Sequence, residues 1–306
     1  MDGWKFQREI DGWASWGQVF QDLEGFSPLA LSILASHGFP PEPLQPLTPG
    51  TNGVFRSGER VIKLFAPIES GLDTLPDWQI EKLLLEKAAE LRVQASRLLA
   101  AGSCQDRYLF RYLILSYCHG REAGAVLSTM TDEQKEAFAV RLRVLLDRLH
   151  QPLDAPVLRR DLVGQVMENP RLKLVAPSLA EEIRRRAAAV PLTPSVLVHG
   201  DCTGENLLVE EDGSLTLIDF ADSSLAPVCY ELPAVVLGLF GGDPVLVRAF
   251  RGPLPLEAFL DQLMDGLCLH DFAGNIVSEF LAAHHIPVED VESLDTLREI
   301  FRQKLA

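Results

Sequence analysis

Residues 199–208 read HGDCTGENLL, a polar segment set between two apolar ones. The run VLV (196–198) comes before it, and LLV (207–209) closes it. Such short apolar runs predict buried strands. A plain connection would need only a turn residue or two, and an acid at the end of a buried strand is costly unless something binds it. The stretch therefore predicts a functional site that contains Asp201 and Asn206.

A second polar segment follows the first after a predicted hairpin. Residues 211–214 (EDGS) favour a tight turn because Asp-Gly tolerates positive φ, and LIDFADS (217–223) follows. Since a hairpin returns the chain to where it left, Asn206 and Asp219 are expected at one end of the same two strands. Their oxygens suit Mg²⁺, which usually takes one or two protein oxygens plus substrate phosphates. Asp201 is then expected on the other side of the phosphate, accepting a proton from an attacking hydroxyl.

The motif HGD-x4-N followed by IDF-x-D resembles the aminoglycoside phosphotransferase family, the small-molecule branch of the protein-kinase-like fold. LTPGTNGVFRSGERVIKLF (47–65) is similar to that family's nucleotide-covering turn and lysine strand. YLILSYCHG (112–120) resembles its last strand and hinge, and LLDRLH (145–150) resembles the helix before the catalytic segment. The similarity covers about residues 45–235, as separate motifs.

The resemblance implies an α+β, two-lobed protein-kinase-like fold with a small β-rich N-terminal lobe and a larger helical C-terminal lobe. The expected lobes are 1–117, with a helical lead-in over 1–44, and 118–306. Hydrophobic periodicity agrees with this order. It predicts helices over 14–37, 78–101, 132–150 and 178–190, strands over 53–56, 60–65, 108–117 and within 196–218, and mostly helix from 231 onward.

The same resemblance assigns roles to single residues. It implies that Asp201 is the catalytic base, that Asn206 and Asp219 hold Mg²⁺, and that Lys63 contacts the nucleotide phosphates. Glu86 in LLLEKAAEL is the expected helix partner of this lysine, with Glu81 as the alternative. The further expected nucleotide contacts are Gly50, Asn52, Ser116, Tyr117 and Cys118.

Three residues near the catalytic segment need separate interpretation. The family often has Asp where this chain has Glu231, and the longer carboxylate is expected to keep the role of bracing that segment. His199 is expected to be structural, with its ring pinning the loop. Cys202 stands where the family usually has a larger residue, and a small buried filler is favoured over a redox role.

The function that follows is phosphoryl transfer from ATP or GTP to a hydroxyl of a small, amine-bearing molecule. A protein kinase is an alternative, although the segment reads His-Gly-Asp rather than His-Arg-Asp and no Ala-Pro-Glu-like segment follows Asp219. A regulatory nucleotide-binding protein without turnover is a second alternative. Against it, the base, both metal ligands and the lysine are all present.

Composition limits the partners and the compartment. The net charge of −15 disfavours nucleic acid and anionic membranes. Residues 199–306 hold 19 acids against 5 Lys and Arg, which agrees with a cationic acceptor. The five cysteines form no C-x-x-C pair, the N-terminus MDGWKFQREIDGW has no apolar core, and the apolar run 232–242 is about half a membrane span. A cytoplasmic location is expected, and the oligomeric state is left open.

Overall fold

The computed structural model describes residues 3–48 and 50–306. Residues 1 and 2, part of the N-terminus discussed above, and residue 49 of the predicted nucleotide-covering turn lie outside this description. The chain forms two compact units. Unit 1 comprises Met1–Glu90, Gln94–His119 and Asp219–Ala221, and unit 2 comprises Leu91–Val93, Gly120–Ile218 and Asp222–Ala306.

Unit 1 is built on a five-stranded antiparallel sheet in the order β1-β2-β3-β5-β4. Its strands are β1 (Leu44–Pro46), β2 (Gly53–Ser57), β3 (Arg60–Leu64), β4 (Leu98–Gln105) and β5 (Leu109–Ser116), and its helices are α1 (Trp13–Val19), α2 (Leu23–Ser36) and α3 (Leu75–Lys87). Gly58 has φ of +58° in the turn between β2 and β3, where a glycine avoids backbone strain. The predicted hairpin and the predicted strand over 108–117 are confirmed, whereas the helix predicted over 14–37 is divided into α1 and α2.

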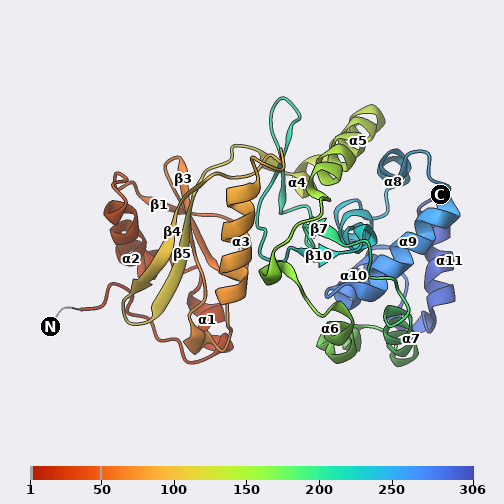
Figure 1. Cartoon of the computed structure of the whole chain (residues 1–306), viewed down its shortest axis with the longest axis horizontal. Coiled ribbons are helices and arrows are strands. Elements are labelled where there is room, and N and C mark those ends of the chain that lie inside the picture. Colours follow the sequence, from red (N-terminus) through yellow and green to blue (C-terminus); the bar gives the residue numbers. More distant parts are fainter. Residues whose placement is uncertain (1–2, 49) are drawn as a thin grey trace. The chain divides into compact units, whose positions relative to one another are not determined.

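The two faces of this sheet are covered differently (Figure 1). Side chains alternate along a strand, so Phe110 and Ile114 of β5 share one face. There they join a core with Phe26 of α2, whose ring lies 5.8 Å from that of Phe110. Helix α3 covers the opposite face, and its Trp78 Nε1 donates to the carbonyl of Tyr112 at 3.0 Å. The lysine strand β3 thus presents Lys63 to α3.

The helix predicted over 78–101 is wrong in its second half. Helix α3 ends at Lys87, Arg92 adopts a left-handed φ of 56°, and β4 begins at Leu98. The leucines at 91 and 98 continue the helical spacing, but β4 pairs with β5 along its length. Long-range pairing has overridden a local pattern that suited either structure.

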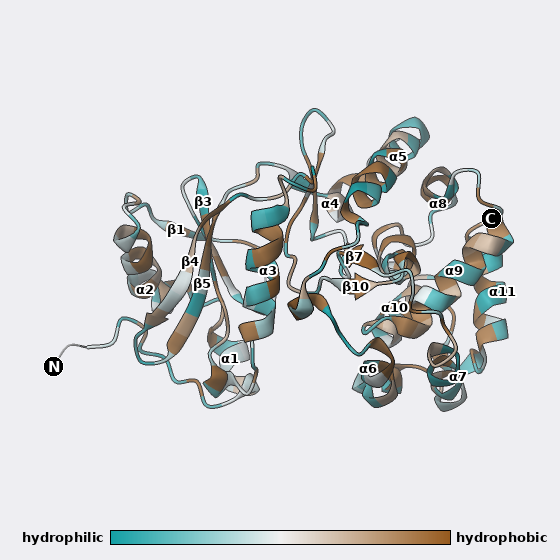
Figure 2. Cartoon of the chain, viewed as in Figure 1, coloured by the Kyte–Doolittle hydropathy of each residue, from teal (hydrophilic) through white to brown (hydrophobic). Residues whose placement is uncertain are grey.

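Unit 2 is mainly helical. Its helices are α4 (Ala123–Leu127), α5 (Asp132–Leu149), α6 (Leu162–Glu168), α7 (Pro177–Ala187), α8 (Pro244–Arg251), α9 (Leu256–Leu269), α10 (Ala273–Ala283) and α11 (Leu294–Lys304), with a π-helix over Ala234–Leu239. Helix α8 packs on α5, and α7 and α11 pack on α9. Figure 2 shows apolar and polar residues side by side along α5, as expected for an amphipathic helix. The predicted helices over 132–150 and 178–190 are confirmed.

Two small sheets in unit 2 carry the functional loops. Strands β6 (Arg121–Glu122), β8 (Leu207–Val209) and β9 (Leu215–Leu217) form one sheet, and β7 (Val196–Val198) pairs antiparallel with β10 (Ser224–Ala226) in the other. Gly213 has φ of +78° in the turn between β8 and β9 and confirms that hairpin. Among the described helices, none is both long enough and apolar enough to cross a membrane.

Candidate active site

In unit 1, three charged side chains meet at the lysine of β3. Lys63 Nζ donates to Glu81 Oε2 on α3 and to Asp219 Oδ1, both at 2.8 Å. The side chains of Lys63 and Glu81 are 5% and 2% exposed, whereas that of Asp219 is 40% exposed. Burial alone would lower the pKa of Lys63, but the charges of Asp219 and Glu81 raise it above its ordinary value. Lys63 therefore stays protonated between two carboxylates.

The assignment of Glu86 as the partner of Lys63 is wrong, and Glu81 has that place. Glu86 instead pairs with Lys82 at 2.8 Å on the exposed side of α3. Five residues along a helix turn the side chain by about 140°, so Glu81 and Glu86 cannot share a face. The buried neighbours Ile80 and Leu84 flank Glu81. This apolar pattern in the sequence could have indicated that Glu81, and not Glu86, faces the sheet.

Asp219 occupies an unusual backbone position. Its φ is 58°, in the left-handed region that Asp tolerates better than most residues, and Ala221 N donates to its Oδ1 at 3.4 Å. Such conformations gather at functional sites. Directly before it, Ile218 N donates to the carbonyl of Asn206 at 3.0 Å. The hairpin therefore returns the chain to Asn206 one residue before Asp219.

In unit 2, Asp201 and Asn206 are tied to each other. Asn206 Nδ2 donates to the Asp201 carbonyl at 2.9 Å and to Asp201 Oδ2 at 2.8 Å. Both amide hydrogens of Asn206 are used in this way. The amide oxygen of Asn206 is the atom that can bind a ligand. Its Nδ2 group fixes the orientation of the Asp201 carboxylate.

His199 pins the same loop from inside. Its ring is fully buried, Asp201 N donates to its Nδ1 at 3.3 Å, and its Nε2 lies 3.1 Å from the carbonyl of Ile218. Because a backbone N–H can only donate, Nδ1 of His199 accepts. Its Nε2 therefore carries the hydrogen and donates it to the Ile218 carbonyl. The expected structural role of His199 is confirmed.

Glu231 braces the catalytic segment, as expected. Its two carboxylate oxygens accept from His199 N at 2.7 Å and from Gly200 N at 3.1 Å. His150, which ends the segment LLDRLH, places Nε2 3.4 Å from Glu231 Oε2. Burial would raise the pKa of Glu231, but the hydrogen bond and charge of His150 and the hydrogen bond from the backbone of His199 outweigh this and lower it. Glu231 thus remains an ionised acceptor for two backbone donors.

Cys202 and Gly200 are small residues at tightly packed positions of the loop. Cys202 is fully buried, and burial raises the pKa of its thiol well above the ordinary value. A buried neutral thiol is a filler, in agreement with the sequence interpretation. Gly200 has φ of +81°, and a Cβ there would lie 2.5 Å from the carbonyl oxygen of Asp222. No larger residue fits at position 200.

The expected hinge contacts are partly engaged within unit 1. Ser116 N donates to the carbonyl of Arg97 at 2.9 Å, and Tyr117 N donates to that of Glu59 at 3.0 Å. Nucleotide binding at Ser116, Tyr117 and Cys118 stays a prediction. Because the N–H groups of Ser116 and Tyr117 already donate within unit 1, the adenine would have to bind other backbone groups of this segment.

The predicted nucleotide-covering turn has two candidate residues. Gly50 is exposed, and a Cβ there would meet open space. Asn52 is buried, and its Oδ1 accepts from Ala66 N at 3.3 Å, which ties the turn to the end of β3. Contacts of Gly50 and Asn52 with a nucleotide stay predictions.

The oxygens of Asn206 and Asp219 fit the chemistry of Mg²⁺. Within residues 3–48 and 50–306, no three His, Cys, Asp or Glu side chains cluster as metal ligands. A cage made of protein side chains alone is therefore not built in the described part of the chain. Mg²⁺ can take its other ligands from water and phosphate, and its binding by Asn206 and Asp219 stays a prediction.

Comparisons with known proteins agree with this geometry. The sequence model of the phosphotransferase enzyme family (APH) matches residues 50–267. Among curated protein sequences, none matches the chain.

Several solved structures are similar in fold. The gentamicin–APH(2″)-IIa complex is 17% identical, with 85% of this chain and 97% of that chain covered and a TM-score of 0.58. The GDP complex of wild-type aminoglycoside 2′-phosphotransferase-IIIa is 16% identical, with 90% and 98% covered and a TM-score of 0.58. A choline/ethanolamine kinase family protein from Mesorhizobium loti is 17% identical, with 90% and 96% covered and a TM-score of 0.56. The predicted α+β, protein-kinase-like fold is confirmed.

Proposed function

This chain belongs to the phosphotransferase enzyme family, and we propose that it moves the γ-phosphate of ATP or GTP to a hydroxyl of a small molecule. The observation that carries the proposal is the fixed Asp201 carboxylate at the end of β7, held by Asn206 Nδ2 at 2.8 Å. A carboxylate held in this way is ready to orient a hydroxyl and accept its proton.

The other residues take roles around the phosphates. Lys63 would bind phosphate oxygens, with Glu81 holding its ammonium group in place. Asn206 and Asp219 would hold Mg²⁺. When bound, this ion would neutralise charge on the β- and γ-phosphate oxygens. Asp201 would accept the proton of the attacking hydroxyl.

An amine on the acceptor is a finer part of the proposal. It is supported by the surplus of 19 acids over 5 basic residues in 199–306. Two similar structures also bear the names of gentamicin and of choline/ethanolamine kinase. Carboxylates near the site would raise the association rate of a cation.

The test is acceptor-dependent release of ADP or GDP in the presence of Mg²⁺. The panel holds aminoglycosides, amino alcohols, hydroxy acids and a generic protein substrate. We expect one small-molecule class to stimulate release and the protein substrate to have no effect. If the nucleotide raises the melting temperature but no acceptor stimulates turnover, the proposal fails and a regulatory binding protein replaces it.

A further inference from the structure

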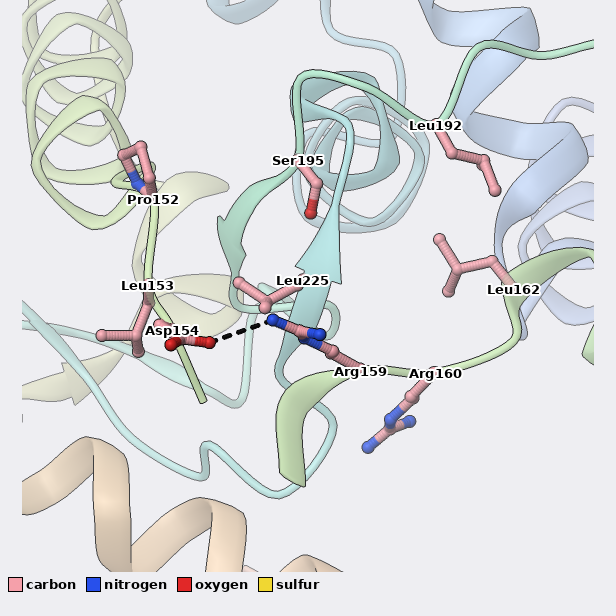
Figure 3. A pocket seen from close by; sticks show the side chains of 9 residues that line it. All are labelled: Pro152, Leu153, Asp154, Arg159, Arg160, Leu162, Leu192, Ser195 and Leu225. Carbon is pink, nitrogen blue, oxygen red and sulfur yellow. Dashed lines mark hydrogen bonds and ion pairs between the residues drawn. The ribbon is translucent and has the colours of Figure 1, made fainter. Parts of the chain in front are cut away.

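Unit 2 contains a pocket beside the strand that leads to Asp201 (Figure 3). Its volume is about 780 Å³, within the range of small-molecule sites. It is lined by Pro152, Leu153, Asp154, Arg159, Arg160, Leu162, Leu192, Ser195 and Leu225.

This lining carries more basic than acidic side chains, whereas the C-terminal third of the chain, which contributes only Leu225 to it, is acidic. Among the described residues of the wall, two are arginines and one, Asp154, is an acid. By contrast, residues 199–306 hold 19 acids and 5 Lys and Arg. Leucines and a proline make up most of the remaining wall. The pocket therefore suits a ligand with an apolar part and a negative group.

Strand pairing places the pocket beside the strand that leads to the catalytic loop. Leu225 of β10 lies opposite Leu197 of β7, and Ser195 directly precedes β7. Asp201 follows Leu197 by four residues, which span at most about 14 Å of extended chain. The pocket wall and the catalytic loop are therefore connected through the strand pair β7–β10.

The arginines differ in their surroundings. The Arg159 guanidinium pairs with Asp154 at 3.0 Å, and Figure 3 shows this contact as a dashed line. These side chains are 67% and 88% exposed, so the pair contributes little and can exchange for a ligand. The charge of Arg160 acts on Tyr230. Burial raises the pKa of Tyr230 to about 12, and the charge of Arg160 acts against that rise.

Tyr230 also lies beside the backbone of the catalytic loop. A Cβ built on Gly200 would lie 3.7 Å from the Tyr230 ring, and Gly200 directly precedes Asp201. The positive side of the pocket is thus close to the catalytic loop within the same unit.

We infer that this pocket binds the acceptor, and that the acceptor carries an oxyanion, a carboxylate or a phosphate, bound by Arg159 and Arg160. Guanidinium groups bind such oxyanions through paired, charge-assisted hydrogen bonds. The inference rests on the proposed function and narrows it. The same acceptor can also carry an amine, which the carboxylate of Asp154 would bind.

The first experiment compares acceptors that differ only in the anion. The pairs are L-homoserine with 3-amino-1-propanol, D-glycerate with glycerol, and glycerol 3-phosphate with glycerol, and kanamycin is the polycationic reference. We expect the member that carries the carboxylate or phosphate to exceed its partner without that anion about tenfold or more in kcat/KM, because a hydrogen bond to an ion contributes that much. The carboxylate and phosphate pairs distinguish the two sources of the oxyanion.

The second experiment removes the guanidinium groups. Arg159→Gln and Arg160→Gln should each raise KM for the anionic acceptor about tenfold or more, with KM for ATP or GTP unchanged. Arg248→Gln, at an exposed arginine paired with Glu136, is the matched control and should change neither value. If Arg160→Gln does not fold, Arg159→Gln carries the test, because its side chain is exposed.

The outcomes separate the two proposals. If kanamycin or the members that lack the anion turn over best, or if both glutamine variants keep the acceptor KM, the inference is overturned while the proposed function stands. A raised KM for the nucleotide alone would assign the arginines to the phosphates and overturn it as well. If no acceptor of any charge releases ADP or GDP, the proposed function fails and the inference falls with it.

Discussion

The two groups of functional residues are held by different forces. In unit 1, Lys63 Nζ is held by two carboxyl groups at 2.8 Å from separate parts of the chain, of which Glu81 has its pKa raised by burial to about 7. In unit 2, Asp201 sits in a loop held by directional hydrogen bonds: Asp201 N donates to the His199 ring, and the Glu231 carboxylate accepts from two backbone N–H groups.

The difference matches the work proposed for each group. Lys63 and Asp219 must take new partners when nucleotide phosphates and a metal ion arrive, and ion pairs can be exchanged in this way. The loop of Asp201 has to keep its shape while a proton moves, and buried hydrogen bonds with fixed geometry maintain it. The predictions below test this contrast.

The largest effect is expected at the base. Asp201→Asn should lower kcat about 10²–10⁴-fold, because the variant cannot accept the proton, while the nucleotide-induced rise in melting temperature stays. Glu205→Gln, in the same loop but exposed, is the control and should keep the wild-type kcat. An active Asp201→Asn enzyme would rule out the assignment of Asp201.

The next effect tests the charged group in unit 1. Glu81→Ala should lower the free energy of unfolding by about 3 kcal/mol and raise KM for the nucleotide, because it leaves the buried Lys63 with one carboxylate fewer. Glu86→Ala, on the same helix, should stay within about 0.5 kcal/mol of wild type. Denaturant titration measures both. Equal losses in the two variants would contradict the corrected pairing.

A third effect concerns pH and unit 2. His270 is fully buried and stacks on Tyr230 with ring centroids 4.6 Å apart. Burial lowers the pKa of His270 to about 4, so between about pH 6.5 and pH 4 the unfolded chain binds a proton that the folded chain does not. Stability should therefore fall as the pH falls, by about 2 kcal/mol from pH 7 to pH 5 at this residue.

His270→Gln separates this contribution from those of other titrating groups, since glutamine keeps an acceptor for Phe272 N. The variant should show a flatter dependence of the unfolding free energy on pH across the same range. A slope identical to that of wild type would mean that His270 does not cause the loss.

The smallest effect is expected at the brace. Glu231→Gln keeps the shape but replaces one acceptor oxygen with a donor, so either His199 N or Gly200 N loses its partner. We expect kcat to fall about tenfold with little change in KM for the nucleotide, in line with one lost charge-assisted bond. Glu231→Asp, the residue common in the family, is the comparison and should lose less. A loss confined to nucleotide affinity would contradict the bracing role.

The sequence predicted the parts of the site that depend on local order. Asp201, Asn206 and Asp219 follow or precede short apolar runs, and the Asp-Gly turn between them indicated the hairpin. Because a hairpin returns the chain to its start, spacing alone brought Asn206 near the end of β9. The brace by Glu231 also followed from its place in a known motif.

Contacts between distant elements were beyond the sequence pattern. The choice between Glu81 and Glu86 depends on how α3 is rotated against the sheet, and two glutamates on one helix look alike until that rotation is known. The extra helical turns predicted after Lys87 failed for a related reason, since leucines at 91 and 98 suit a helix and a strand equally. Arg159 and Arg160 form no motif, and only the fold places them in one pocket wall.

The sequence by itself determined the fold class and the identity of the candidate catalytic residues, because short motifs encode strand ends and tight turns through local geometry. The tertiary structure decided which carboxylate holds Lys63, where α3 stops, and what charge lines the pocket next to the catalytic loop. These features arise from side chains that are far apart in the chain, and their partners are set by packing and strand register rather than by spacing.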